Sequence, residues 1–191
     1  NDKEYSEAGA KISYNVEEAF GCNIVLKVAP PTLQEIEYIK PQSVLLSALQ
    51  LKTQSKKYFE TLAKKRITAF AFDYIKDEHG FYPIVKSLSE IAGTASVLIA
   101  AELLSNSNKG NGLLVGNIGG VPPTDVVIIG AGTVGEFAAR SALGLGARVK
   151  VFDNSITKLR RLQHCLNTPI YTSTIQPKTL SKALMRCDIA I

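Results

Sequence analysis

Short apolar runs alternate with longer segments of mixed polarity along the first half of the chain. The runs at residues 23–28, 43–46 and 67–72 are predicted to be strands, and residues 33–39 and 55–65 are predicted to be helices. Strands that alternate with helices in this way are typical of α/β proteins, whose sheets are mainly parallel.

A long helix is predicted over residues 87–104, where Ile91 and Ala95 begin an apolar series at helical spacing. Ser87 or Ser89 is expected to cap its first turn, because a serine side chain can accept a hydrogen bond from an unpaired helical N–H. We expect this helix to join two domains.

The second half continues the alternation of strands and helices. The run DVVII at residues 125–129 has no polar break, which predicts a strand buried on both faces of a parallel sheet. The other predicted strands are residues 112–116, 148–152, 169–171 and 188–191, and the predicted helices are residues 133–145, 155–165 and 177–185.

A glycine-rich turn, GAGTVG, follows the DVVII strand from Gly130 to Gly135. Gly130 permits a tight turn out of the strand, and Gly132 leaves the backbone open to a pyrophosphate. Gly135 lets the following helix lie close to the strand. The first N–H groups of that helix are unpaired and attract phosphate, so the motif predicts a dinucleotide site.

Asp153 follows the next apolar strand, where an acid usually binds the ribose hydroxyls of the adenosine. A carboxylate there repels a 2′-phosphate and favours NAD(H), whereas Lys158 and Arg160 leave NADP(H) open. The alternative is a structural turn in a domain that binds no nucleotide. A dinucleotide fold needs two mononucleotide-binding halves and only the first is found, so we expect a fragment of a longer protein.

Composition narrows the class of protein. The net charge is +5, and the densest basic cluster is Lys56, Lys57, Lys64, Lys65 and Arg66. This cluster contains no interleaved aromatic residues, so we interpret it as a solvated helix face rather than a nucleic-acid site.

Membrane and metal sites are not expected either. The sequence contains no run of 18 apolar residues that would predict a membrane span, and no leader peptide is visible. Cys22, Cys165 and Cys187 have no metal-binding spacing. We expect them to be buried thiols of a reduced, cytoplasmic protein with no metal site.

Several stretches together resemble one known family. They are IVLKVAP at residues 24–30, SEIAG at 89–93, GLLVGNIGGVPP at 112–123, the segment 126–153 and KLRRL at 158–162. The combination is similar to the alanine dehydrogenase and proton-translocating transhydrogenase alpha-subunit family, and closer to alanine dehydrogenase.

The resemblance implies two Rossmann-like domains joined by the long helix, with the substrate side at residues 1–86 and the NAD-binding domain at residues 87–191. The chain would be a fragment of both. The residues that match family contacts to NAD are Ser89, Thr133, Val134, Asp153 and Lys158. The resemblance also implies a homo-oligomer.

The substrate side departs from the alanine dehydrogenase pattern. The family's Lys-Val-Lys-x-Pro stretch is Lys27-Val28-Ala29-Pro30 here, so Ala29 replaces the lysine that holds the substrate. Gln50 stands in the place of the family's acid–base histidine. A glutamine can hydrogen-bond a substrate but cannot exchange a proton near neutral pH. Lys27 and Gln50 remain the candidate contacts to an amino acid or 2-oxo acid.

Three functions follow from these observations. The first is NAD-dependent oxidative deamination of L-alanine to pyruvate and ammonium. The second is an NAD(H)-binding transhydrogenase component, although the short GFYPIVKS segment at residues 80–87 is closer to alanine dehydrogenase. The third is an NAD-binding relative that has lost its chemistry, which the replacements at Ala29 and Gln50 favour.

Overall fold

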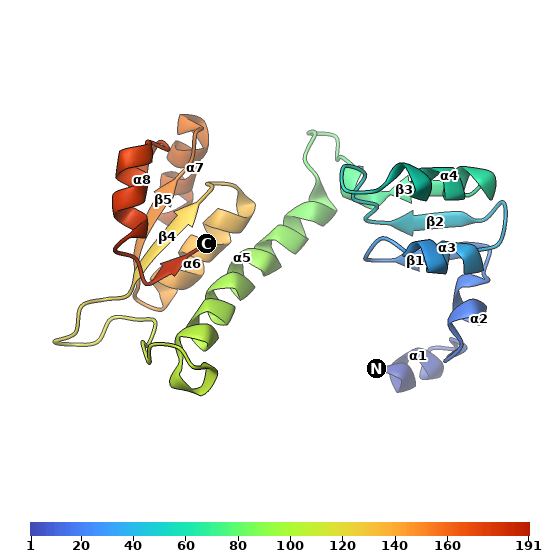
Figure 1. Cartoon of the computed structure of the whole chain (residues 1–191), viewed down its shortest axis with the longest axis horizontal. Helices are drawn as coiled ribbons and strands as arrows, with labels where there is room; N and C mark the ends of the chain where they lie inside the picture. The colour runs from blue at the N-terminus through green and yellow to red at the C-terminus, as the bar shows by residue number, and fades with distance from the viewer. The chain divides into compact units, whose positions relative to one another are not determined.

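The computed structural model describes residues 1–191, which form two compact units, Asn1–Ile84 and Val85–Ile191 (Figure 1). Each unit contains one sheet, and all pairs of adjacent strands in both sheets are parallel. The expectation of an α/β fold with mainly parallel sheets is therefore confirmed.

The first unit has a three-stranded sheet in the order β1-β2-β3. The strands run in register, so that Lys27, Ser47 and Ala71 lie at the same edge, where the strands end. The elements of this unit are α1 (Asp2–Glu7), α2 (Val16–Phe20), β1 (Ile24–Lys27), α3 (Leu33–Tyr38), β2 (Val44–Ser47), α4 (Lys56–Lys64), β3 (Thr68–Ala71) and the 3₁₀ turn η1 (Phe72–Tyr74). The sequence pattern did not predict α1 and α2.

The basic cluster is not a uniformly solvated face. Lys65 follows α4, and only 18% of its side chain is exposed. Its Nζ donates hydrogen bonds to the carbonyl oxygens of Ile36, Glu37 and Ile39 at the end of α3. A lysine in this position satisfies carbonyl groups that a helix end leaves unpaired, so Lys65 joins α3 to α4.

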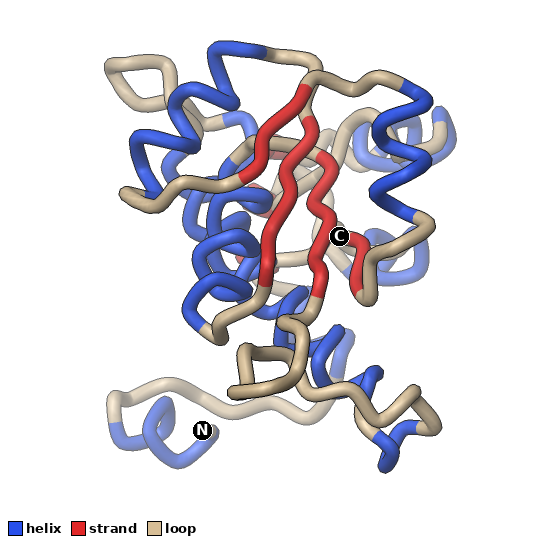
Figure 2. Tube along the Cα trace, turned by 90° about the vertical axis from the view of Figure 1, so that its left-hand side faces the viewer, coloured by secondary structure: helices blue, strands red, loops and turns tan.

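The second unit has a four-stranded sheet in the order β6-β5-β4-β7, and Figure 2 shows strands side by side with helices to either side. Its elements are α5 (Pro83–Leu104), which begins just inside the first unit, η2 (Asn106–Asn108), β4 (Asp125–Ile129), α6 (Thr133–Gly144), β5 (Arg148–Phe152), α7 (Ile156–Leu166), β6 (Tyr171–Ser173), α8 (Pro177–Leu184) and β7 (Ile189–Ala190).

Both faces of β4 are buried, as predicted. Val126 and Ile128 belong to the larger core with residues of α5, α6 and α7, whereas Val127 packs on the opposite face with Phe152 and Ala183. The two faces of the sheet are therefore covered by different helices, and the strand ends between them are free to form a site.

Three local predictions were wrong. Residues 112–116 form no strand, because Thr124 Oγ1 donates to the Leu114 carbonyl and accepts from the Gly116 amide, which holds this segment as a loop. The long helix begins at Pro83, so Ser87 and Ser89 lie inside it and not at its N-cap position. The short strand lies at Tyr171–Ser173, because its pairing with β5 starts at Tyr171.

Helix α5 contains 22 residues and is long and apolar enough to cross a membrane, by length and composition alone. Its buried residues, Gly93 and Val97, pack within the second unit. A side chain at Gly93 would collide with the Val134 carbonyl and the Phe137 side chain, so α5 packs directly on the first turns of α6.

Candidate cofactor-binding site

The glycine-rich turn connects the central strand β4 to helix α6. Gly130 has a φ of 117°, a conformation that a residue with a Cβ rarely adopts. Gly132 is the N-cap residue of α6 and contributes no side-chain oxygen to the helix end. The first N–H groups of α6 consequently have no side-chain cap, which is the arrangement that attracts phosphate.

The space beside Gly132 is open. A Cβ built on this residue meets no atom within 4 Å, so no protein side chain fills the position above the backbone. A Cβ on Gly135 would instead collide with the Gly130 carbonyl oxygen, which shows how closely α6 approaches the turn. The turn is therefore open toward solvent and tightly packed toward the sheet.

Asp153 lies directly beside this turn, at the end of β5. Its Oδ2 accepts a hydrogen bond of 2.7 Å from the Ala131 amide, and its Oδ1 accepts one of 2.7 Å from the Ser155 amide. Burial favours a higher pKa for Asp153, but these two amides and the nearby Lys158 outweigh it and hold the pKa below its ordinary value. Asp153 is thus an ionised carboxylate that also fixes the turn.

A cavity of about 470 Å³ joins these groups. Gly130, Asp153 and Lys158, three of the predicted cofactor residues, line it together. Ile129, Asn154, Ser155 and Ile175 complete the lining. The Ile175 side chain makes one wall of the cavity apolar.

The other predicted cofactor residues lie at the start of α6 or on α5. Thr133 and Val134 are the first two residues of α6. Ser89 lies on the face of α5 that contains Gly93, one turn earlier, because residues four apart share a helix face. Its side chain makes no hydrogen bond to the turn.

The sequence pattern did not predict the buried charged group, Glu136, that lies next to the turn. Glu136, in α6, is 7% exposed and accepts hydrogen bonds from Arg140 and from Arg161 of α7. Burial alone would raise the pKa of Glu136, but the two arginines lower it below its ordinary value. Arg161 also donates to the Ala131 carbonyl at 3.1 Å. The Ala131 residue is consequently held at its N–H by Asp153 and at its C=O by Arg161.

The candidate substrate residues lie at one edge of the first sheet, Lys27 as the last residue of β1 and Gln50 in the loop after β2. Lys27 Nζ is bound to both carboxylate oxygens of Glu35, at 2.7 and 2.8 Å, and lies 5.7 Å from the centre of the Phe20 ring. Gln50 is exposed and has a φ of 49°. Asp73 accepts hydrogen bonds from the Leu49 and Gln50 amides, so it stabilises the loop that presents Gln50.

The remaining polar candidates are dispersed. No group of three or more His, Cys, Asp and Glu side chains is arranged to hold a metal ion. All three cysteines are free, and Cys22 is exposed rather than buried, because it follows the short helix α2 at the surface.

Two family descriptions match the chain. The N-terminal domain of alanine dehydrogenase/PNT matches residues 1–92, and the C-terminal domain of the same family matches residues 96–191. The chain belongs to the alanine dehydrogenase/PNT family.

Individual relatives agree with this family assignment. An alanine dehydrogenase of Bilophila wadsworthia is 31% identical over 190 residues, and one of Staphylococcus epidermidis is 33% identical over 190 residues. Each alignment covers 100% of this chain but only 50% and 51% of the respective relative. The chain therefore spans about half the length of the alanine dehydrogenases that it matches.

Solved structures of an L-alanine dehydrogenase and of a transhydrogenase share the fold. An L-alanine dehydrogenase superposes with a TM-score of 0.86 at 30% identity, over 99% of this chain and 52% of that one. A transhydrogenase from Sinorhizobium meliloti gives a TM-score of 0.78 at 21% identity, over 99% of this chain and 55% of that one. The similarity to the transhydrogenase shows the fold alone. The Rossmann-like architecture expected from the sequence is confirmed.

Proposed function

We propose that this chain binds NAD(H) at the glycine-rich turn and forms part of an NAD-dependent dehydrogenase that converts L-alanine to pyruvate and ammonium. The observation that supports it most directly is the open backbone at Gly132 beside an uncapped helix end, with Asp153 at the end of the neighbouring strand. The similarity to alanine dehydrogenases over the whole chain supports the choice of reaction.

The residues present fit a dinucleotide. The pyrophosphate would lie against the Gly132 backbone and the first amides of α6, where Thr133 and Val134 stand. The ribose hydroxyls would donate hydrogen bonds to Asp153, whose ionised carboxylate disfavours the 2′-phosphate of NADP(H). When bound, NAD supplies the acceptor for the substrate hydride, and the chain supplies binding and orientation.

Lys27 and Gln50 would act on the substrate by charge and hydrogen bonding. Lys27 provides a positive charge for a carboxylate if it leaves Glu35, and the exposed Gln50 can donate or accept a hydrogen bond. Gln50 cannot exchange a proton near neutral pH. We propose that the substrate is an amino acid or a 2-oxo acid. From the family resemblance, we also propose that the protein is a cytoplasmic homo-oligomer.

The second candidate is an NAD-binding relative without turnover. Its support is specific: Ala29 and Gln50 replace a lysine and a histidine that the resemblance assigns to catalysis, and Lys27 is already paired with Glu35. An absorbance assay for NADH with L-alanine and NAD separates the candidates. NADH formation favours the dehydrogenase, and NAD binding without NADH formation favours the second candidate.

The substitution Gly132→Ala tests the cofactor site. A methyl group fits the protein here, since nothing lies within 4 Å of its position, but it occupies the space where the pyrophosphate would approach the backbone. We expect the melting temperature to fall by no more than about 4 °C, because alanine is a poorer N-cap than glycine. NAD affinity, measured by calorimetric titration, should fall at least about tenfold.

Gly144→Ala is the matched control for this experiment. Gly144 is the last residue of α6, also has open space around it, and is remote from the turn in the helix. It should leave NAD affinity unchanged and leave stability equal or slightly higher, because alanine is favoured over glycine in a helix. Equal NAD affinity in the Gly132→Ala and Gly144→Ala variants would contradict the proposed site.

A further inference from the structure

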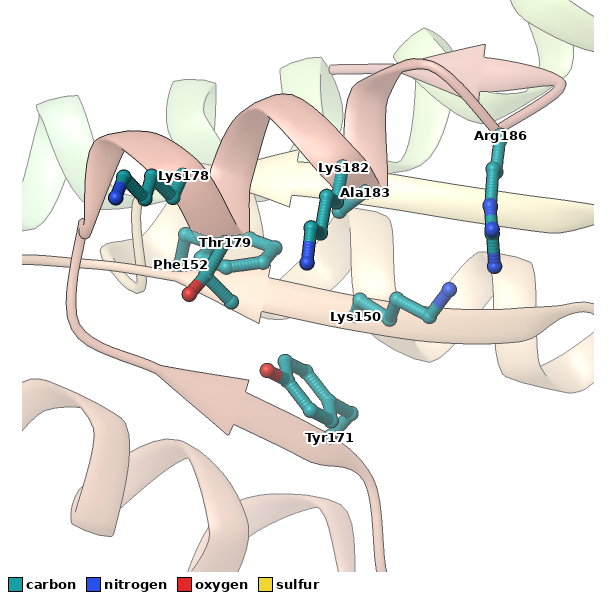
Figure 3. Close-up of a pocket in the computed structure, with 8 residues that line it drawn as sticks. All are labelled: Lys150, Phe152, Tyr171, Lys178, Thr179, Lys182, Ala183 and Arg186. Carbon is teal, nitrogen blue, oxygen red and sulfur yellow. The ribbon is translucent and has the colours of Figure 1, made fainter.

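A second cavity lies on the α8 face of the same sheet, and the proposed function does not use it. It has a volume of about 390 Å³ and is lined by Lys150, Phe152, Tyr171, Lys178, Thr179, Lys182, Ala183 and Arg186 (Figure 3). It shares no lining residue with the cavity at Asp153. Because successive residues of a strand face opposite sides, Lys150 and Phe152 of β5 lie on the side of the sheet away from Val151.

Four cationic side chains surround this cavity, and no acidic side chain lines it. Lys178 and Lys182 share a face of α8, about 6 Å apart along the helix axis. Arg186 follows just beyond the helix end, and Lys150 is the third residue of β5. In Figure 3, Lys182 and Arg186 extend from the α8 segment toward β5 and Lys150.

Three of these four positive charges have no ion-pair partner within the chain. Lys178, Lys182 and Arg186 make no ion pair, whereas lysines elsewhere, such as Lys27 and Lys56, are paired with glutamates. Lys150 has only Asp125, at 3.8 Å, and that carboxylate is already bound by Arg148. Concentrated like charges at a concave surface repel one another and are stabilised by a bound anion.

The base of the cavity is aromatic. Phe152 is fully buried, and its ring centre lies 5.9 Å from that of Tyr171, which is 47% exposed. The Tyr171 ring is therefore available to stack on a planar group, and the Thr179 hydroxyl offers a neutral hydrogen-bonding group. A site with several cations and one ring fits a ligand that combines phosphates with a ring.

We propose that this cavity is a second anion site that binds a small molecule with two or more linked phosphates, such as a nucleoside diphosphate. The phosphates would contact Lys182, Arg186 and Lys150 through charge-assisted hydrogen bonds, and the nucleobase would lie against Tyr171. The proposal does not rest on NAD binding, because the two cavities are separate.

Calorimetric titration of the full chain with pyrophosphate and with ADP, in the presence of saturating NAD, tests the site. We expect one pyrophosphate or one ADP to bind per chain. The affinity should weaken as the salt concentration is raised from about 50 to about 300 mM, because salt screens the attraction between the cationic side chains and the phosphates. The double variant Lys182→Gln/Arg186→Gln should lower both affinities at least about tenfold. Tyr171→Leu should weaken ADP but not pyrophosphate.

The matched control is Lys57→Gln/Lys64→Gln, which removes the same charge from the exposed side of α4. It should leave both affinities unchanged. Equal losses in the two double variants would overturn the proposal, as would the absence of pyrophosphate binding at low salt. Binding of heparin without binding of pyrophosphate would also overturn it, since a general basic surface would then explain the charge. If ADP binding disappears only when NAD is added, ADP occupies the cofactor site and the proposal is wrong.

Discussion

Two glycines of one motif have different physical roles at the level of single residues. Gly132 has open space around it, so its lack of a side chain matters only to a ligand that approaches the backbone. Gly135 lies against the Gly130 carbonyl, so its lack of a side chain matters to the folded chain itself. Substitution at Gly132 can therefore report on binding without a large effect on folding.

Asp153 combines binding with stabilisation of the turn, and its lowered pKa gives a pH-dependent prediction. A carboxyl whose pKa is lower in the folded chain stabilises that state above its ordinary pKa, and this stabilisation is lost as pH falls through the folded pKa. Asp153→Asn should therefore lower the free energy of unfolding at pH 6 by more than it does at pH 3. Urea unfolding at both pH values measures the difference.

The exposed Asp2 gives the control for this comparison, since Asp2→Asn changes a carboxyl outside the turn. If the destabilisation by Asp153→Asn is as large at pH 3 as at pH 6, the amides of Ala131 and Ser155 do not stabilise the ionised carboxylate, and our account of the turn is wrong.

The pattern of residues predicted the elements of the cofactor site well, because each signal is local. The run DVVII is uninterrupted, GAGTVG follows it directly, and the next apolar strand ends at Asp153. The strand predicted at residues 112–116 was wrong, although an apolar run between glycines is typical of a strand. Hydrogen bonds to Thr124, eight or more residues away in the sequence, hold this segment as a loop.

The support behind the turn could not be predicted in the same way. Arg161 and Glu136 are 25 residues apart and belong to different helices, so only the packing of α7 against α6 reveals their pairing. The basic residues around α8 were likewise inconspicuous in the sequence, because Lys150 and Lys178 line one cavity only once the parallel crossover has returned α8 over the sheet.

Arg161→Gln tests the contribution of α7 to the turn. The change leaves the Ala131 carbonyl without its donor and Glu136 with one arginine instead of two. We expect the free energy of unfolding to fall by about 1 kcal/mol, a modest loss because Arg161 is partly exposed to solvent. NAD affinity should fall severalfold, since the turn is less rigid.

Chemical denaturation and NAD titration measure both effects. Arg160→Gln is the stability control: Arg160 is the preceding residue of the same helix, is exposed and makes no ion pair. If the two variants unfold at the same denaturant concentration, the bonds from Arg161 contribute nothing measurable to the turn.

At the scale of the whole molecule, the two units have separate hydrophobic cores. The core of the first unit consists of Val25, Ile36, Ile39, Leu45, Leu49, Tyr58 and Leu62, and none of these residues belongs to either core cluster of the second unit. The proposed cofactor residues all lie in the second unit, whereas the substrate candidates Lys27 and Gln50 lie in the first. Stability of the first unit and NAD affinity should therefore respond to different substitutions.

Leu45→Ala tests this separation. Leu45 is fully buried in β2, so its truncation should lower the stability of the first unit by about 2–5 kcal/mol through lost burial and a cavity. Hydrogen exchange followed by mass spectrometry should show faster exchange in β1, β2 and β3 and unchanged exchange in β4 and β5. Leu26→Ala is the control, because Leu26 is 74% exposed in β1 of the same sheet. Equal acceleration in both units, with a parallel loss of NAD affinity, would mean that the chain unfolds as one cooperative body.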